Sequence, residues 1–149
     1  MRQLMYSMQF TGQATPVEGS PNVLKATTFA PSCTMTTVID ASGVNGAFEP
    51  IAGERATFES EVVLSATTAF QERGTITFGL GHDRLRFGTV GEGYLAASAD
   101  PRCSHGCVIW RIEEGEGRFA GATGLITSNF TVSEIGAVTD NHFGVIYLP

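Results

Sequence analysis

Apolar and polar residues alternate along much of this chain. Residues 4–12 alternate with Tyr6, Met8 and Phe10 on one face, and the alternation returns from residue 55. A period of two places successive side chains on opposite faces, which is typical of a half-buried strand. The inward face of the second segment comprises Ala56, Phe58, Ser60, Val62 and Leu64. The pattern therefore predicts that Ser60 points into a core.

Turn signals divide the remaining sequence into more short strands. Strands are predicted at 23–30 and 33–40, around Phe78, Phe87, Tyr94, Trp110 and Phe130, and over the last residues with Phe143, Val145 and Tyr147 alternating. Glycine, proline, asparagine and aspartate predict the turns between them. They predict a long connection over 41–53, a hairpin tip over 100–106 and a turn near Asp140–Asn141. No helical period is present, and we count about eight or nine strands.

The glycine-rich stretch Gly115–Gly124 decides between all-β architectures. A G-x-G sequence can bind a dinucleotide only where it opens a helix, and the residues that follow here alternate like a strand. Glycine within strand sequence marks bends and close backbone approach, which close a sheet into a barrel. The sequence predicts one domain, residues 1–149, folded as a closed antiparallel β-barrel of about eight strands with Phe119 packed at a corner.

Composition excludes several functions. The net charge is −6 with a single lysine, which argues against nucleic-acid binding. No apolar run is long enough to cross a membrane, and the first residues lack a signal peptide's apolar segment, so a cytoplasmic protein is expected. Three cysteines are an odd number, and free thiols are the expectation in a reducing compartment. Cys103, His105 and Cys107 could bind a metal, but the hairpin tip explains them better.

Three stretches resemble, in the same order, segments of the allene oxide cyclase barrel superfamily, which includes dirigent-like proteins and small bacterial barrels. Gly115–Gly124 resembles its G-x-G-x-F-x-G-x-x-G motif. Ser20–Pro21 followed by Val23–Lys25 matches a Ser-Pro-x-Val-Leu-Lys stretch, and Phe78–Leu95 resembles the strand pair before a Gly-Ala-Tyr-Leu segment. The similarity covers about residues 10–130 and implies the same barrel with an apolar pocket.

The resemblance also implies positions for a site. The Ser-Pro pair that helps hold the epoxide oxygen in the cyclases falls on Ser20 and Pro21, a cavity tyrosine on Tyr94 and a substrate-facing cysteine on Ser60. The family's first-strand glutamate and its companion asparagine are missing. The resemblance therefore implies the barrel and its pocket without the allene oxide reaction.

Alternation and resemblance together give the candidate site. Tyr94 is expected to polarise a substrate oxygen, Ser20 and Ser60 to orient the substrate, and Glu18 to move a proton unless it is a solvated loop residue. His82 and His142 are expected at the surface beside turns. The residues predicted to line one cavity are Tyr6, Ser60, Phe78, Phe87, Tyr94, Trp110 and Tyr147, with Ser20 and Pro21 at its edge.

Two classes of function fit these expectations. The first is an isomerase or cyclase that needs no cofactor and no metal and acts on a small apolar substrate derived from a polyketide or a fatty acid. The alternative is a non-catalytic barrel that binds an apolar small molecule. The resemblance also implies a homo-oligomer, a trimer or a dimer.

Overall fold

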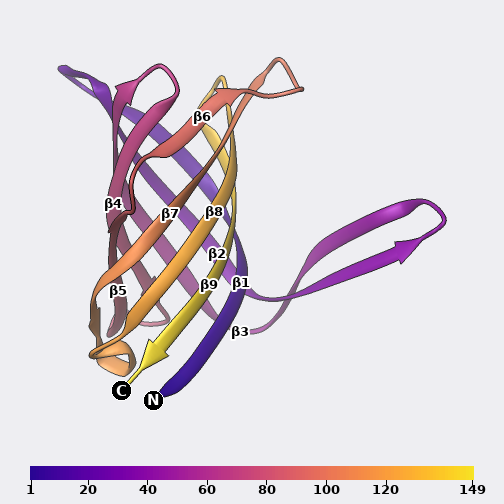
Figure 1. Ribbon diagram of the computed structural model, residues 1–149, viewed down its shortest axis with the longest axis vertical. Coiled ribbons are helices and arrows are strands. Elements are labelled where there is room, and N and C mark those ends of the chain that lie inside the picture. Colours follow the sequence, from indigo (N-terminus) through magenta and orange to yellow (C-terminus); the bar gives the residue numbers. More distant parts are fainter.

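The computed structural model describes residues 1–149 and consists almost entirely of β-strands (Figure 1). One turn of 3-10 helix, η1 (Gly117–Phe119), is the only helical element. The strands are β1 (Arg2–Val17), β2 (Ser20–Asp40), β3 (Gly43–Ala66), β4 (Ala69–Phe78), β5 (Asp83–Thr89), β6 (Gly93–Ala97), β7 (Cys103–Glu116), β8 (Thr123–Ser133) and β9 (Ala137–Leu148). The chain contains no helix with the length and hydropathy needed to cross a membrane.

The strands close into a ring. Antiparallel backbone pairing joins β3, β2, β1, β9, β8, β7, β5 and β4 in that order, and the pairing of β4 with β3 completes the circle. Beyond a bend, β6 continues the path of β5 and pairs with both β4 and β7. Closure of the sheet removes most of its open edges. The predicted antiparallel barrel of about eight strands is confirmed.

Large aromatic side chains fill the middle of the barrel. The rings of Phe58, Phe87 and Trp110 contact one another, with the Phe58 centroid 5.3 Å from each of the other two, and Phe10 stacks on His142 at 4.3 Å. All five side chains are at most 2% exposed. The predicted inward positions of Phe87 and Trp110 are therefore confirmed. The prediction that His142 lies at the surface is wrong, because its position in β9 faces this aromatic layer.

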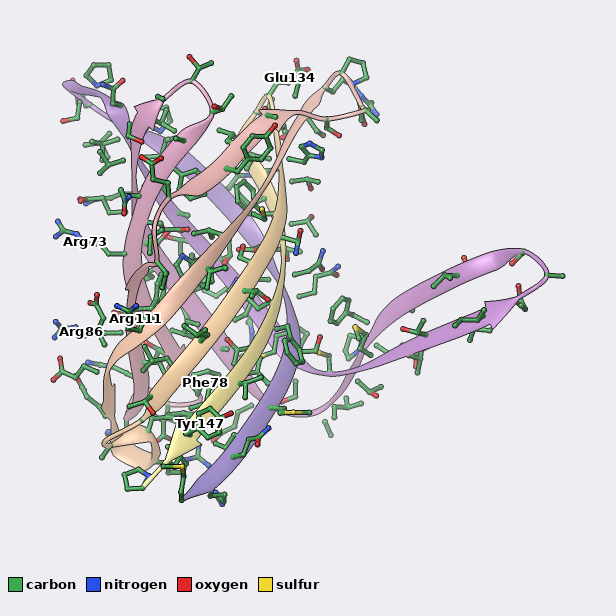
Figure 2. All side chains as sticks on the ribbon, in the orientation of Figure 1. Arg73, Phe78, Arg86, Arg111, Glu134 and Tyr147 are labelled. Carbon is green, nitrogen blue, oxygen red and sulfur yellow. The ribbon has the colours of Figure 1, made fainter.

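The predicted corner at Gly115–Gly124 is confirmed as the connection between β7 and β8. A side chain on Gly115 would collide with the backbone of Phe119, so glycine permits the close approach of the two segments. The Phe119 ring packs against Phe78 with centroids 4.9 Å apart. Both rings pack against the core, and Figure 2 shows Phe78 toward the lower end of the barrel.

Three other turn predictions are wrong in whole or in part. Residues 41–53 are not a long connection, because β2 and β3 pair from Cys33–Pro50 to Asp40–Gly43 and form a hairpin that projects from the barrel (Figure 1). Asp140–Asn141 is not a turn but the middle of β9, and the chain turns at Gly136 with a φ of 82°. Residues 104–106 likewise belong to β7 rather than to a hairpin tip.

Candidate functional site

The upper half of the barrel interior is hollow. A cavity of about 330 Å³ lies above the aromatic layer, and 13 of its 21 lining residues are hydrophobic. Pro101, Arg102 and Cys103 of the β6–β7 turn and Glu134 of the β8–β9 turn form its mouth. Figure 2 shows Glu134 at this end of the barrel and Phe78 toward the other. The barrel is therefore filled at one end and open to a small molecule at the other.

Residue size explains the position of the cavity. Below it, the interior is filled by the aromatic layer around Phe58. At its own level β1, β2 and β6 contribute several small inward residues, namely Ala14, Ala26, Thr28 and Ala97, beside the larger Leu24 and Leu95. The rings of Phe70 and Phe130 lie against Gly93 and Gly106, where a side chain would collide with them. This arrangement lays both rings against the wall and leaves the centre empty.

Glu72 lies at the floor of the cavity. The residue is 8% exposed and lines the cavity, and its carboxyl group accepts a 2.6 Å hydrogen bond from the Ser60 hydroxyl. Burial and, to a smaller extent, the negative charge of Asp140 raise the pKa of Glu72, and the hydrogen bond from Ser60 lowers it; the net result is a rise from 4.5 to about 8. The indole N–H of Trp110 also favours the ionised form, although its geometry falls short of a hydrogen bond. At neutral pH Glu72 is therefore mainly protonated and can donate a hydrogen bond or a proton.

Thr89 holds the backbone of Glu72 in place. Its hydroxyl accepts a hydrogen bond from the Glu72 amide and donates one to the Glu72 carbonyl, each at 2.8 Å. The backbone pairing of β4 with β5 ends at Arg73–Gly88. The Thr89 side chain therefore makes the hydrogen bonds to Glu72 that the next backbone pair would have made. This contact holds the backbone of Glu72 at the point where the β4–β5 pairing ends.

A second buried carboxylate, Asp140 on β9, also lines the cavity. The Ser128 hydroxyl donates a 2.6 Å hydrogen bond to one carboxylate oxygen, and Nε2 of His142 lies 2.9 Å from the other. An ionised Asp140 requires the proton on Nε2, which leaves Nδ1 of His142 buried without a partner. These contacts hold both oxygens of the Asp140 carboxyl group in place by hydrogen bonds.

The two carboxyl groups have different environments and hence different chemical abilities. Glu72 has a single hydroxyl partner and a raised pKa, whereas Asp140 accepts two hydrogen bonds. Neither forms an ion pair with lysine or arginine. Environments that separate the protonation of two neighbouring carboxyl groups assign one as an acid and the other as a base. The hydroxyl of Thr28 adds a buried polar group without a partner to the same cavity.

Replacing Ser60 by alanine is expected to raise the pKa of Glu72 above about 8. The hydrogen bond from the Ser60 hydroxyl stabilises the ionised carboxylate and so lowers the pKa of Glu72. Without this bond, less opposes the rise in pKa that burial causes. A pH titration followed by ¹³C NMR of the glutamate carboxyl carbons measures this shift. The substitution Ser65→Ala, on the exposed part of β3, is the control. An unchanged or lower Glu72 midpoint in Ser60→Ala would contradict the assigned hydrogen bond.

The structure brings together some of the residues predicted for the site. Ser60 faces inward as predicted and contacts Glu72 rather than the cavity directly. Phe87 and Trp110 form the layer beneath the floor. Tyr6 and Phe78 also point inward, but they form an edge-to-face pair at the closed end, with ring centroids 6.3 Å apart. The prediction of one cavity shared by all these residues is therefore wrong.

Two of the predicted cavity residues lie on the outer surface. Tyr94 is 51% exposed because Gly93 and Leu95 occupy the inward positions of β6. Tyr147 is 37% exposed because Ile146 and Leu148 point inward. A strand register wrong by one residue moves every side chain to the opposite face. Neither tyrosine can polarise a substrate in this cavity.

The predicted loop residues lie away from the cavity. Glu18 lies in the β1–β2 turn, and Ser20 and Pro21 begin β2; Glu18 and Pro21 are exposed, and none of the three lines the cavity. Their predicted roles remain predictions without a supporting contact. Cys103 lies at the mouth, while His105 and Cys107 are exposed along β7. No group of three or more histidine, cysteine or acidic side chains is placed to hold a metal ion.

Sequence reasoning missed Glu72, Asp140 and His142. The signal was present as alternation, since Phe70, Glu72, Gly74 and Ile76 share one face of β4. The same count along β9 places Val138, Asp140 and His142 inward together with Ile146. A carboxylate within an otherwise apolar inward series indicates a functional group rather than a surface residue.

Comparisons with models of protein families, with curated proteins and with solved structures found no match to this chain. The resemblance to the allene oxide cyclase barrels therefore stays a prediction. What the chain does has to be argued from its own cavity.

Proposed function

We propose that this protein is a cofactor-free isomerase or cyclase that acts on a small apolar molecule inside the barrel cavity. The observation that carries this proposal is a carboxyl group with a pKa raised to about 8, at the floor of a cavity of about 330 Å³. A general acid is most effective when its pKa lies near the working pH. A polyketide- or fatty-acid-derived intermediate is the kind of substrate that such an apolar cavity accommodates.

The reaction we propose is a paired proton transfer. Protonated Glu72 donates its proton to an oxygen or an unsaturated carbon of the substrate, while ionised Asp140 removes a proton from a carbon. The electron pair of the broken C–H bond shifts a double bond or closes a ring, so the product is an isomer of the substrate. Glu72 ends as a carboxylate and Asp140 as an acid, and transfer of one proton between them, directly or through solvent at the mouth, restores the starting state.

The surrounding residues support this chemistry in two ways. His142 and Ser128 hold Asp140 by hydrogen bonds, so its geometry does not need to reorganise during the reaction. The free hydroxyl of Thr28 is available to bind a substrate oxygen. The walls contributed by Phe58, Phe70 and Phe130 exclude water and confine the substrate near the floor. The site then needs only to hold the substrate and to transfer protons to and from it.

Hydrogen exchange tests the proposal without knowledge of the natural substrate. We expect the protein to accelerate α-proton exchange of apolar ketones and enones of up to about 15 heavy atoms in D₂O, followed by ¹H NMR, by at least about tenfold over buffer. Displacement of the neutral fluorescent probe N-phenyl-1-naphthylamine measures binding in parallel, and Trp110 beneath the floor is an intrinsic reporter. Saturable binding of the panel with no acceleration of exchange would instead favour the non-catalytic binding barrel.

A further inference from the structure

The hairpin Cys33–Pro50, called the arm below, extends away from the barrel. Its eight residue pairs run from Cys33–Pro50 to the turn at Asp40–Gly43, a length of about 26 Å at the usual rise per residue. Figure 1 shows the arm projecting sideways from the lower half of the barrel, with no other strand beside it. An isolated two-stranded hairpin is only marginally stable in water. The arm therefore requires another surface to stabilise it.

One face of the arm is apolar and uncovered. Cross-strand pairing places Met35 opposite Phe48, and Ile39 opposite Val44, on the same face. Ile39 is 79% exposed, Val44 70% and Met35 49%. The opposite face carries mainly threonine, asparagine and the two carboxylates Asp40 and Glu49. This amphipathic pattern is that of a ribbon whose apolar face packs against a partner.

The barrel has an open edge beside the base of the arm. β1 pairs with β9 from Arg2 to Gln13, but β2 pairs with β1 only up to Phe29, because beyond that point it bends away into the arm. Residues 2–10 of β1 thus have a strand neighbour on one side only. A groove of about 720 Å³ lies along this edge and is lined by apolar side chains that include Leu4, Met5, Tyr6, Phe78 and Phe119. Such an edge can accept an added strand from another chain.

The charges of the two surfaces are complementary. Arg2 and Arg55 border the groove, and neither forms an ion pair within the chain, whereas five of the other six arginines do. Asp40 at the arm tip and Glu49 near its base also lack a cationic partner, and no lysine or arginine lies between residues 32 and 53. An acidic arm and a basic groove attract each other, whereas two arms repel each other and so do two grooves.

The base of the arm prevents it from folding back onto its own groove. Pro31 has no amide hydrogen to continue the ladder, and a register shift follows between Pro31 and Cys33. The Ser32 hydroxyl donates a 2.7 Å hydrogen bond to the Glu54 carbonyl and locks the two strands at this bend. At its base the arm contacts its own β1 through hydrogen bonds of Ser7 with Cys33 and Met35, and Cys33, Thr34 and Met35 line one end of the groove.

From these observations we infer that the arm is an exchange element of a two-fold homodimer. Each arm lies edge to edge along the free β1 strand of the second copy, with its apolar face turned into the groove and its opposite, acidic face outward, where its two carboxylates lie near the exposed Arg2 and Arg55. Arm and groove are neighbours in one chain, so a single two-fold axis engages both pairs at once and closes the assembly. The inference concerns the lower end of the barrel and does not depend on the proposed reaction.

Charge reversal on the two surfaces tests this dimer by light scattering and sedimentation at about 20 µM. We expect the unmodified chain to be a dimer. The arm variant Asp40→Arg with Glu49→Arg, and the groove variant Arg2→Glu with Arg55→Glu, should each be monomeric, with dimer dissociation constants raised at least about 100-fold by like-charge contacts. An equimolar mixture of the two variants should form a heterodimer, because each arm then meets a groove of opposite charge.

Circular dichroism confirms that each variant is folded before mixing. A control with Glu59→Arg and Glu113→Arg makes the same charge change on the outer barrel wall and should remain dimeric. A monomeric unmodified chain would overturn the inference. A dimer that survives both reversals, or variants that stay monomeric after mixing, would overturn it as well.

Discussion

Replacing Glu72 by glutamine is expected to slow proton exchange of a ketone substrate by about 10²- to 10⁴-fold, the range for loss of one general acid. Glutamine has nearly the shape of a protonated glutamate and can still bond to Ser60, but it cannot release a proton. Binding of the neutral probe should change less than about threefold, because the apolar walls of the cavity remain. The initial rate of deuterium incorporation and the probe dissociation constant measure the two effects separately.

The pH dependence gives this prediction a second readout. The acid form of Glu72 is lost as the pH rises through about 8, so the exchange rate of the unmodified protein should fall above that pH. Glu59→Gln, the same chemical change on the exposed outer face of β3, is the matched control and should retain the full rate. Equal rates in Glu72→Gln and the control would remove Glu72 from the mechanism.

Strand periodicity was sufficient to predict the barrel from the sequence. Inward and outward positions differ in polarity along β1, β3 and β7, because one face contacts the core and the other contacts water. Glycine marked the β7–β8 corner, since the close approach at Gly115 leaves no room for a side chain. These features depend on local packing and can therefore be recognised in the local sequence.

The arm could not be predicted in the same way. Asn45, Gly46 and Pro50 usually signal a loop, yet all three lie in the paired strands of the arm. A two-stranded ribbon has free edges and tolerates proline and glycine that a central strand would exclude. Its amphipathic face has no counterpart within the chain, so only the three-dimensional arrangement shows that it needs a partner.

The floor of the cavity was missed because it breaks the pattern that predicts strands. Asp140 and Asn141 favour turns through side-chain bonds to nearby backbone, but Asp140 bonds instead to Ser128 and His142. That error displaced the register of β9 by one residue and turned Tyr147 inward in the prediction. Polar residues at inward positions contradict binary patterning, and such contradictions concentrate at functional sites.

The free energy of unfolding is expected to fall as the pH rises from about 4.5 to about 8. The pKa of Glu72 is 4.5 in its ordinary environment and about 8 in the folded barrel, so the folded state binds a proton that the unfolded state releases in this interval. The stabilisation is complete below pH 4.5 and is lost as the pH passes 8. A difference of about 3.5 pH units corresponds to about 5 kcal/mol. Urea unfolding at half-unit intervals from pH 4.5 to 8.5 measures this slope.

In the variant Glu72→Gln, the free energy of unfolding should no longer fall between pH 4.5 and pH 8. The amide does not ionise, so at pH 8.5 the variant is expected to exceed the unmodified protein by most of that 5 kcal/mol, while near pH 4.5 the two should be about equally stable. Glu59→Gln, on the outer face, should keep the unmodified slope. A variant that is less stable than the unmodified protein at pH 8.5 would mean that the folded barrel favours the ionised form of Glu72 and does not raise its pKa. The acid of the proposed reaction would then have to be another group, and Asp140 with its two hydrogen bonds could no longer be assigned as the only charged carboxylate at the floor.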